Sequence, residues 1–228
     1  LPLLPDQAEQ LVAQAEQAPY GRGGDTLVDT EVRRTWQLDA TQVTIGGRRW
    51  AEDLASIVRE AATGLGVSGA VEAEFYKLLV YDTGSFFVPH RDTEKAPGMF
   101  ATLVVVLPSP FTGGELVIRH KSHEARLDLR RDEPSEVAWA AFYADCRHEV
   151  LPIASGYRLA LIYNLIRPHG EPVPQPPDHD SVRTTVTELL RAWGDAPNKL
   201  VLPLEHAYTE AEFGFQTLKG ADAAVAGV

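Results

Sequence analysis

The most informative pair of residues in the sequence is His90 and Asp92, in the segment FFVPHRD. Side chains two positions apart on an extended chain point the same way, so this imidazole and this carboxylate can bind one metal ion from the same side. Arg91 lies between them, alternates to the opposite face and is not predicted to be a ligand. Because His-x-Asp also arises by chance, two polar surface residues after a strand are the alternative interpretation of this pair taken alone.

A second histidine, His148, begins the β-rich run HEVLPI much later in the chain. Two histidines and one carboxylate make up the facial triad of non-haem iron(II) oxygenases, which leaves coordination positions open for a 2-oxo acid and dioxygen. The sequence therefore predicts His90, Asp92 and His148 as metal-binding and catalytic residues, and iron as the metal, since zinc has no redox chemistry. A surface position is the alternative for His148 considered alone.

Arg158 lies ten positions after His148, in the next strand-like run, YRLALIYNLI. The residues at 154–156, Ala-Ser-Gly, predict a tight turn, and a hairpin there would bring Arg158 into the interior near the metal. A buried arginine needs an anionic partner, and its planar guanidinium fits a carboxylate such as that of 2-oxoglutarate. An ion pair with a protein carboxylate, or an outward-facing position, is equally compatible with the sequence.

These four residues and their neighbours resemble the prolyl-4-hydroxylase-like branch of the 2-oxoglutarate/Fe(II) oxygenase superfamily. The similar segments are LLVYDTGSFFVPHRD, ATLVVVLPSPFTGGELVI and HEVLPIASGYRLALIYNL. The resemblance implies a mainly β fold with flanking helices (α+β), built on a double-stranded β-helix, or jelly-roll, core. It also implies that Tyr81 binds the 2-oxoglutarate cofactor together with Arg158, through a hydrogen bond from its phenol.

Two departures from the family pattern concern the substrate side of the site. Several relatives carry an aromatic residue in the strand that matches LVVVL, where this chain has Val104, Val105 and Val106. Collagen-type prolyl hydroxylases carry lysine at the position that matches Arg158. The resemblance therefore predicts the class of reaction better than it predicts the substrate.

The resemblance implies a dioxygenase that hydroxylates an unactivated C–H bond with Fe(II), 2-oxoglutarate and O2, releases succinate and CO2, and responds to ascorbate as a stimulant. Related halogenases leave the carboxylate position empty for halide, so Asp92 favours hydroxylation. The expected substrate is a prolyl or other side chain of a peptide or protein, with a small molecule as the alternative. A non-catalytic β-barrel binding module and a zinc hydrolase are the competing functions.

The composition limits the binding partners, the types of metal site and the cellular location that we expect. With 228 residues and a net charge of −11, the chain is large enough for one core and is not expected to bind nucleic acid. Its single cysteine, Cys146, excludes a cysteine zinc cluster and is predicted to be a small buried residue. No membrane span or signal peptide is recognised, which predicts a cytoplasmic protein. The oligomeric state stays open, as does a longer parent protein, because the chain begins without Met.

The pattern of apolar residues and breaks divides the chain into four parts. Residues 1–70 are predicted to supply helices and a strand that support the core, and residues 71–166 to form the oxygenase core itself. Residues 167–180 are rich in proline and predict a linker or surface loop, followed by a C-terminal helix and tail at 181–228. The run LVVVL is apolar at every position, so it should be covered on both faces.

Several other polar residues invite a functional interpretation. His120 and His123 have a spacing that could bind a metal, but their charged surroundings favour an exposed loop. Asp145 and Glu149 flank His148 and are expected to be solvated, with a hydrogen bond to His148 as the alternative.

Overall fold

The computed structural model describes residues 2–22, 25–67, 69–92, 95–131, 133, 136–168, 180–193, 201, 203–208, 214–215, 218, 222 and 226. The helices are α1 (Pro5–Gln14), the short 3-10 helix η1 (Ala40–Gln42), α2 (Trp50–Gly64) and α3 (Asp180–Arg191). The strands are β1 (Glu16–Gln17), β2 (Tyr20–Arg22), β3 (Asp25–Leu27), β4 (Arg33–Arg34), β5 (Trp36–Asp39), β6 (Glu72–Tyr81), β7 (Phe86–His90), β8 (Met99–Leu107), β9 (Phe111–Gly113), β10 (Leu116–His120), β11 (His123–Leu127), β12 (Ala138–Tyr143), β13 (Arg147–Val150), β14 (Ile153–Gly156) and β15 (Arg158–Ile166).

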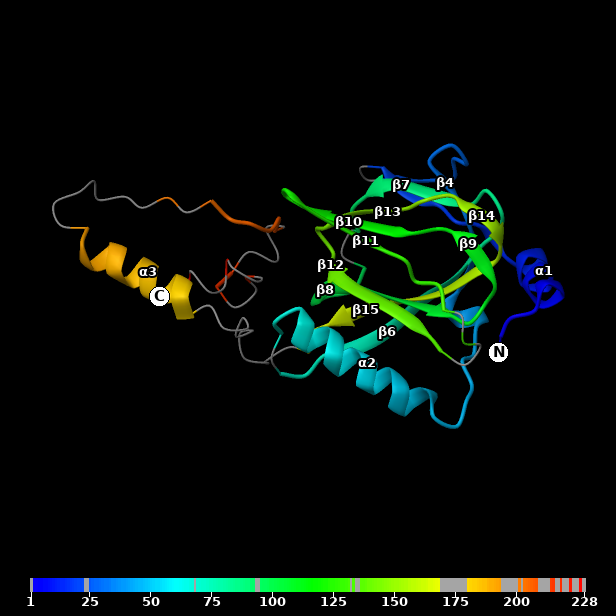
Figure 1. The fold of residues 1–228 in the computed structure, drawn as a ribbon, viewed down its shortest axis with the longest axis horizontal. Coiled ribbons are helices and arrows are strands. Elements are labelled where there is room, and N and C mark those ends of the chain that lie inside the picture. The colour runs from blue at the N-terminus through cyan, green and yellow to red at the C-terminus, as the bar shows by residue number, and fades with distance from the viewer. Residues whose placement is uncertain are drawn as a thin grey trace.

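Two antiparallel sheets make up the body of the molecule (Figure 1). One sheet has six strands in the order β1-β5-β6-β15-β8-β12, and the other has five in the order β11-β10-β13-β7-β4. Strands far apart in the sequence are hydrogen-bonded neighbours in both sheets, for example β6 with β15 and β7 with β13. This arrangement confirms the predicted mainly β jelly-roll core with flanking helices.

The central strand β8 shows how the apolar sequence builds two separate cores. Val104 and Val106 belong to the apolar cluster between the two sheets, because alternate side chains of a strand point to opposite faces. Leu103 and Val105 belong to the second cluster, where Ile57 of α2 covers the outer face of the six-stranded sheet. Burial of each such side chain contributes roughly 1.5–3 kcal/mol. The prediction that LVVVL is covered on both faces is confirmed.

The first helix is shorter than its apolar spacing predicts. The spacing extends the helix from residue 6 to residue 18, but α1 ends at Gln14, and Glu16 and Gln17 pair with β5 as strand β1. The backbone N–H of Ala18 also donates to the carbonyl of Thr35. Hydrogen bonding to an available sheet edge therefore overrides the weak local preference for helix.

The predicted hairpin between His148 and Arg158 is wrong. The Ala-Ser-Gly segment at 154–156 lies in β14, which pairs with β9, and is not a tight turn. β13 and β15 belong to different sheets, so the chain crosses from one sheet to the other between the two residues. The register with β9 is fixed at Gly156, whose positive φ of +79° lets the backbone approach the carbonyl of Pro110.

The C-terminal part contains the predicted helix and a tail that packs back on the barrel. The proline-rich linker falls largely outside the described residues. Helix α3 lies beyond the end of the barrel in Figure 1, and its apolar residues Leu189 and Leu190 are 61% and 42% exposed. In the tail, Leu218 and Asp222 are buried. None of the described helices has the length and apolar character that a membrane crossing requires.

We predict that Gly156→Ala lowers the free energy of unfolding by about 2–4 kcal/mol, because a Cβ would lie 2.1 Å from the carbonyl oxygen of Pro110 at a positive φ. Chemical denaturation measures the change. Gly46→Ala is the control, since no heavy atom lies within 4 Å of a Cβ there. Equal stabilities for the two variants would contradict this account of the β9–β14 crossover.

Candidate active site

The pairing of β7 with β13 brings the two predicted histidine ligands together. His90 and His148 are directly opposite each other in this antiparallel pair, and their ring centroids are 4.1 Å apart. Asp92 follows two residues after His90, just beyond the end of β7. One ligand atom from each of the three residues lies within 4.8 Å of the other two. The three predicted ligands therefore converge on one point between the sheets.

Each imidazole is oriented by a hydrogen bond to the backbone two residues earlier. Nδ1 of His90 lies 2.9 Å from the carbonyl oxygen of Val88, and Nδ1 of His148 lies 3.1 Å from that of Cys146. A carbonyl oxygen only accepts, so both Nδ1 atoms carry a proton, and in a neutral imidazole this leaves Nε2 as the nitrogen with a lone pair. This is the tautomer and the type of support that metal-binding histidines use in proteins.

The carboxylate of Asp92 is fixed by a residue that sequence reasoning missed. The hydroxyl of Thr102 donates to Oδ2 of Asp92 at 2.6 Å, and the backbone N–H of Asp92 donates to the carbonyl of Ala144 at 3.1 Å. Thr102 is buried on β8, facing the space between the sheets. The available signal was its polarity, since it is the one hydroxyl within the apolar run FATLVVVL.

Burial, with a smaller contribution from the neighbouring His148, lowers the pKa of His90 to about 3, against the opposing attraction of Asp92. The ring of His90 also stacks on that of Phe87, with centroids 3.5 Å apart. His90 is therefore neutral at neutral pH, which is the protonation state that binds a metal ion.

Arg158 lies deep in the same interior, directly opposite Tyr81 in the β6–β15 pair. Its side chain is only 1% exposed, and its Nε and Nη2 atoms have no hydrogen-bond partner. Burial lowers the pKa of Arg158, and the charge of Tyr81 and a hydrogen bond with it act in the opposite direction. The outward-facing alternative is contradicted, and within the described part of the chain no carboxylate forms an ion pair with this guanidinium. Its free donors suit a carboxylate ligand.

A cavity of about 390 Å³ connects the three converging residues with Tyr81 and Arg158. Its apolar wall includes Leu79, Val104 and Ile162, which come from three adjacent strands of the six-stranded sheet. This wall limits the water around the metal position, and Val104 provides no hydrogen bond there.

A second buried guanidinium, that of Arg33, lines the same cavity and was not predicted from the sequence. Arg33 is 7% exposed, its Nη1 donates to the carbonyl of Pro19 at 2.7 Å, and its Nε has no partner. Its Cζ lies 4.5 Å from the ring centroid of Phe87. Nothing in the alternating pattern of EVRRTWQL separates this arginine from its exposed neighbour Arg34.

The other polar residues near the site have different partners from those expected. Cys146 is buried, as predicted. Glu149 pairs with Arg119, and Asp145 contacts His206 in the tail, whereas Nδ1 of His148 is satisfied by the backbone. The predicted exposed loop at His120 and His123 is a β-hairpin in which His123 is exposed. His120 is only half-exposed, because its ring stacks on that of His206.

The jelly roll with two imidazoles and one carboxylate at its mouth defines the class of non-haem iron oxygenases. The donor set suits iron(II), and the unpaired Nε and Nη2 of Arg158 suit a carboxylate of 2-oxoglutarate, so the residues present fit both groups. Residues 76–166 match the family described as the 2OG-Fe(II) oxygenase superfamily. The matching segment runs from β6 to β15 and contains His90, Asp92, His148 and Arg158.

Three solved structures that this chain is similar to are distant from it in sequence. An oxidoreductase of the 2OG-Fe(II) oxygenase family from Burkholderia pseudomallei is 18% identical, with 75% of this chain and 82% of that chain covered and a TM-score of 0.47. A Pseudomonas putida prolyl-4-hydroxylase is 20% identical, with 73% and 89% covered and a TM-score of 0.44. A Trichoplax adhaerens prolyl hydroxylase in complex with a hypoxia inducible factor peptide is 16% identical, with 71% and 76% covered and a TM-score of 0.45. No curated protein matches this chain.

We predict that Thr102→Val, which removes the hydrogen bond to Asp92 at nearly constant volume, weakens Fe(II) affinity about 10–100-fold. Anaerobic titration with Fe(II) measures the affinity. Thr112→Val is the matched control, because the exposed Thr112 hydroxyl bonds only Ser155 at 2.7 Å among the described residues. An unchanged affinity in Thr102→Val would mean that Asp92 does not need this support to bind metal.

Proposed function

We propose that this protein is a hydroxylase in which His90, Asp92 and His148 hold Fe(II), and Arg158 and Tyr81 bind 2-oxoglutarate. The observation that carries the proposal is the buried guanidinium of Arg158 in the same cavity as the three converging donors, with no ion pair to any carboxylate of the described residues. The reaction would consume O2 and 2-oxoglutarate, insert one oxygen atom into a C–H bond of the substrate and release succinate and CO2. Ascorbate is expected to stimulate it.

When bound, Fe(II) supplies the activation of O2 that is coupled to the decarboxylation of 2-oxoglutarate. The residues of the chain supply position and protection. The Nε2 atoms of His90 and His148 and the carboxylate of Asp92 would hold the metal, and Arg158, which lines the same cavity, would orient the co-substrate. The apolar wall formed by residues such as Val104 keeps water away from the reacting atoms.

We also propose that the substrate carries an anionic group. Besides Arg158, the described residues that line the cavity include the cations Arg33, Lys77 and Arg91, and Asp92 is the only carboxylate among them. The cavity therefore has a local excess of positive charge, although the chain as a whole has a net charge of −11. A cavity of this kind raises the local concentration of anions.

The pKa of Lys77 supports the same proposal. Burial lowers it to about 8, and the neighbouring cations Arg33 and Lys95 contribute, although Nζ of Lys77 donates to Oε1 of Gln37 at 2.8 Å. A bound anion would relieve this repulsion. An acidic peptide segment and a small carboxylic acid share the required chemistry, and a prolyl side chain in an acidic peptide is compatible with it.

The catalytic unit is proposed to be residues 71–166, with residues 1–70 as support and the helix and tail at 181–228 as an addition. The hydrogen-bonded pairing of β5 with β6 and of β4 with β7 is consistent with such support. A cytoplasmic location and the lack of a nucleic acid partner stay predictions.

Removal of a proposed metal ligand should abolish turnover. Asp92→Ala is expected to lower succinate formation from 2-oxoglutarate at least about 100-fold, since loss of mere supporting contacts already costs about 10–100-fold. Asp128→Ala, at an exposed carboxylate paired with Arg130, is the control. Unchanged succinate formation in Asp92→Ala would refute the metal assignment, and zinc-dependent hydrolysis indifferent to 2-oxoglutarate would favour a hydrolase.

Arg158→Gln should chiefly affect the co-substrate. Loss of a buried charge-assisted pair costs about 3–5 kcal/mol, so the KM for 2-oxoglutarate is expected to rise about 100-fold or more. Arg131→Gln, at an exposed arginine, is the matched control. An unchanged KM for 2-oxoglutarate would show that Arg158 does not bind the co-substrate.

Matched libraries test the anionic substrate. Peptides and amino acids that differ only in carrying Glu or Gln, or Asp or Asn, are incubated with Fe(II), ascorbate and 2-oxoglutarate, and products that gain one oxygen atom are detected by mass spectrometry. The acidic member of a pair should react faster, and Arg33→Met should lower its kcat/KM about 10–100-fold through loss of a charge-assisted hydrogen bond. Equal turnover of acid and amide would contradict the proposal.

A further inference from the structure

A second cluster of two histidines and one aspartate lies outside the active site. His120 ends β10, Asp145 lies in the turn between β12 and β13, and His206 belongs to the C-terminal tail. One ligand atom from each of the three lies within 4.8 Å of the other two. No residue is shared with the first cluster, and the proposed hydroxylase has no use for this one.

The side chains of this second cluster are packed closely together. Nδ1 of His206 lies 3.1 Å and 3.2 Å from the two carboxylate oxygens of Asp145. The rings of His120 and His206 stack nearly parallel, with an interplanar angle of 18° and centroids 4.7 Å apart. The side chains of His206 and Asp145 are only 6% and 10% exposed. Two histidines that are far apart in the sequence therefore meet at one largely buried carboxylate.

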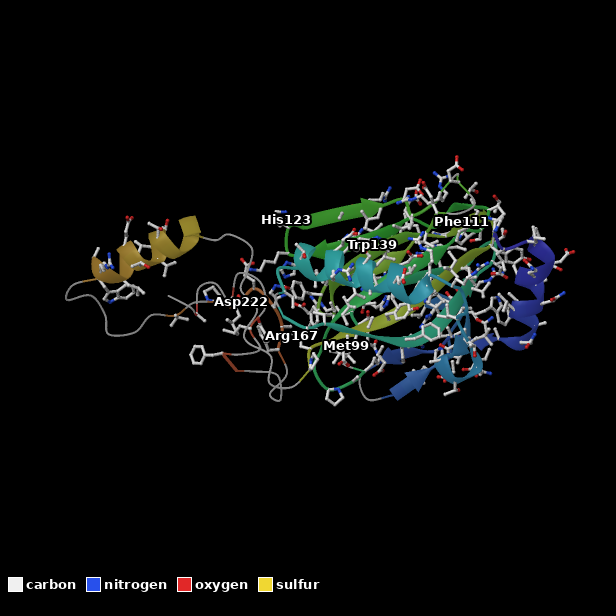
Figure 2. All side chains as sticks on the ribbon, turned by 90° about the horizontal axis from the view of Figure 1, so that it is seen from below. Met99, Phe111, His123, Trp139, Arg167 and Asp222 are labelled. Atoms are coloured by element: carbon white, nitrogen blue, oxygen red, sulfur yellow. The ribbon has the colours of Figure 1, made fainter. Side chains whose placement is uncertain are left out.

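A second buried carboxylate, Asp222 of the tail itself, orders the segment around His206. Asp222 accepts hydrogen bonds from the backbone N–H groups of Glu205 at 2.6 Å and of His206 at 2.9 Å, and from the hydroxyl of Tyr208 at 2.9 Å. The backbone N–H of Ala207 donates to Asp145 at 3.1 Å. Figure 2 shows Asp222 at the same end of the barrel as His123, away from Phe111. His206 is therefore positioned before any ligand binds.

The spacing of the donor atoms suits a small divalent ion. Ligands about 2.0–2.1 Å from a tetrahedral zinc ion lie roughly 3.3 Å from each other. The separation of His206 Nδ1 from the Asp145 oxygens, 3.1–3.2 Å, is close to that value. The carbonyl oxygen of Glu205 lies 3.2 Å from Nε2 of His120 and offers a fourth donor. Imidazole and carboxylate donors favour zinc and its neighbours over calcium or magnesium.

We propose that His120, Asp145 and His206 bind a divalent transition metal ion, Zn²⁺ first among them, at a structural site that fastens the C-terminal tail to the barrel. Two residues close to this cluster in the sequence contact residues of the candidate active site. Ile118, two residues before His120, pairs with His148, and Ala144, next to Asp145, accepts the backbone hydrogen bond of Asp92. Metal binding at the second cluster would therefore stabilise the turn and the strand that carry the iron ligands.

The test isolates the second site in a chain whose first site is disabled. His90→Gln protein, stripped with a chelator, is titrated with Zn²⁺ alone, and bound metal is counted by mass spectrometry of the metal after gel filtration. One ion per chain is expected, together with a higher Tm and protection of the tail from limited proteolysis. Adding His206→Gln or Asp145→Asn should lower the affinity for Zn²⁺ at least about 100-fold and remove both effects. Asn still accepts the hydrogen bond from Ala207, so Asp145→Asn tests the ligand rather than the docking of the tail.

His90→Gln/His123→Gln is the control, since His123 is exposed on the same hairpin and should keep the ion. Retention of one ion in the control and its loss in both cluster variants would support the second site. No bound ion in His90→Gln, or an ion that survives His206→Gln and Asp145→Asn, would overturn it and leave the contacts of the cluster as hydrogen bonds that dock the tail. Neither outcome depends on oxygenase activity, so this test of the second metal site is independent of the tests of the proposed hydroxylase function.

Discussion

The burial of the Arg158 guanidinium is the main constraint on this interior. Arg158 is 1% exposed, and no carboxylate of the described residues forms an ion pair with it. Removing a charge from water costs several kcal/mol unless an opposite charge and hydrogen bonds replace the water. The ring of Tyr81, 5.0 Å from Cζ, offsets only part of that cost. Arg158 sits on β15, between β6 and β8, so it cannot leave the core without breaking the central sheet. A bound anion, as proposed for 2-oxoglutarate, would offset the remaining cost.

The second constraint is the register of the strands that carry the proposed metal ligands. His90 and His148 are far apart in the sequence and meet only because β7 and β13 are neighbours with these two residues opposite each other. A slip of one residue would turn either imidazole to the other face of the sheet. The same alternation sends Thr102 and Val104 of β8 toward the cavity and Leu103 and Val105 toward α2. One strand pattern therefore specifies both the outer core and the inner wall of the site.

Much of this could be predicted from the sequence because it depends on local spacing. The two-residue alternation of His90 and Asp92, together with His148 in a later strand-like run, indicated the converging side chains, and the family resemblance of these segments implied the jelly roll. Contacts that depend on chain crossings could not be predicted. The path through β14, the hydrogen bond from Thr102 to Asp92 and the buried position of Arg33 each arise from partners brought together by the whole fold. The docking of His206 on Asp145 likewise has no local sequence signal.

The most direct test of the central claim is the visible absorption spectrum of the protein with Fe(II) and 2-oxoglutarate in the absence of oxygen. Simultaneous binding of the metal by His90, Asp92 and His148 and of the co-substrate by Arg158 predicts a weak charge-transfer band that appears only when both are present, in a ratio of one iron and one 2-oxoglutarate per chain. No band at saturating Fe(II) and 2-oxoglutarate, in protein shown to be folded, would contradict the account.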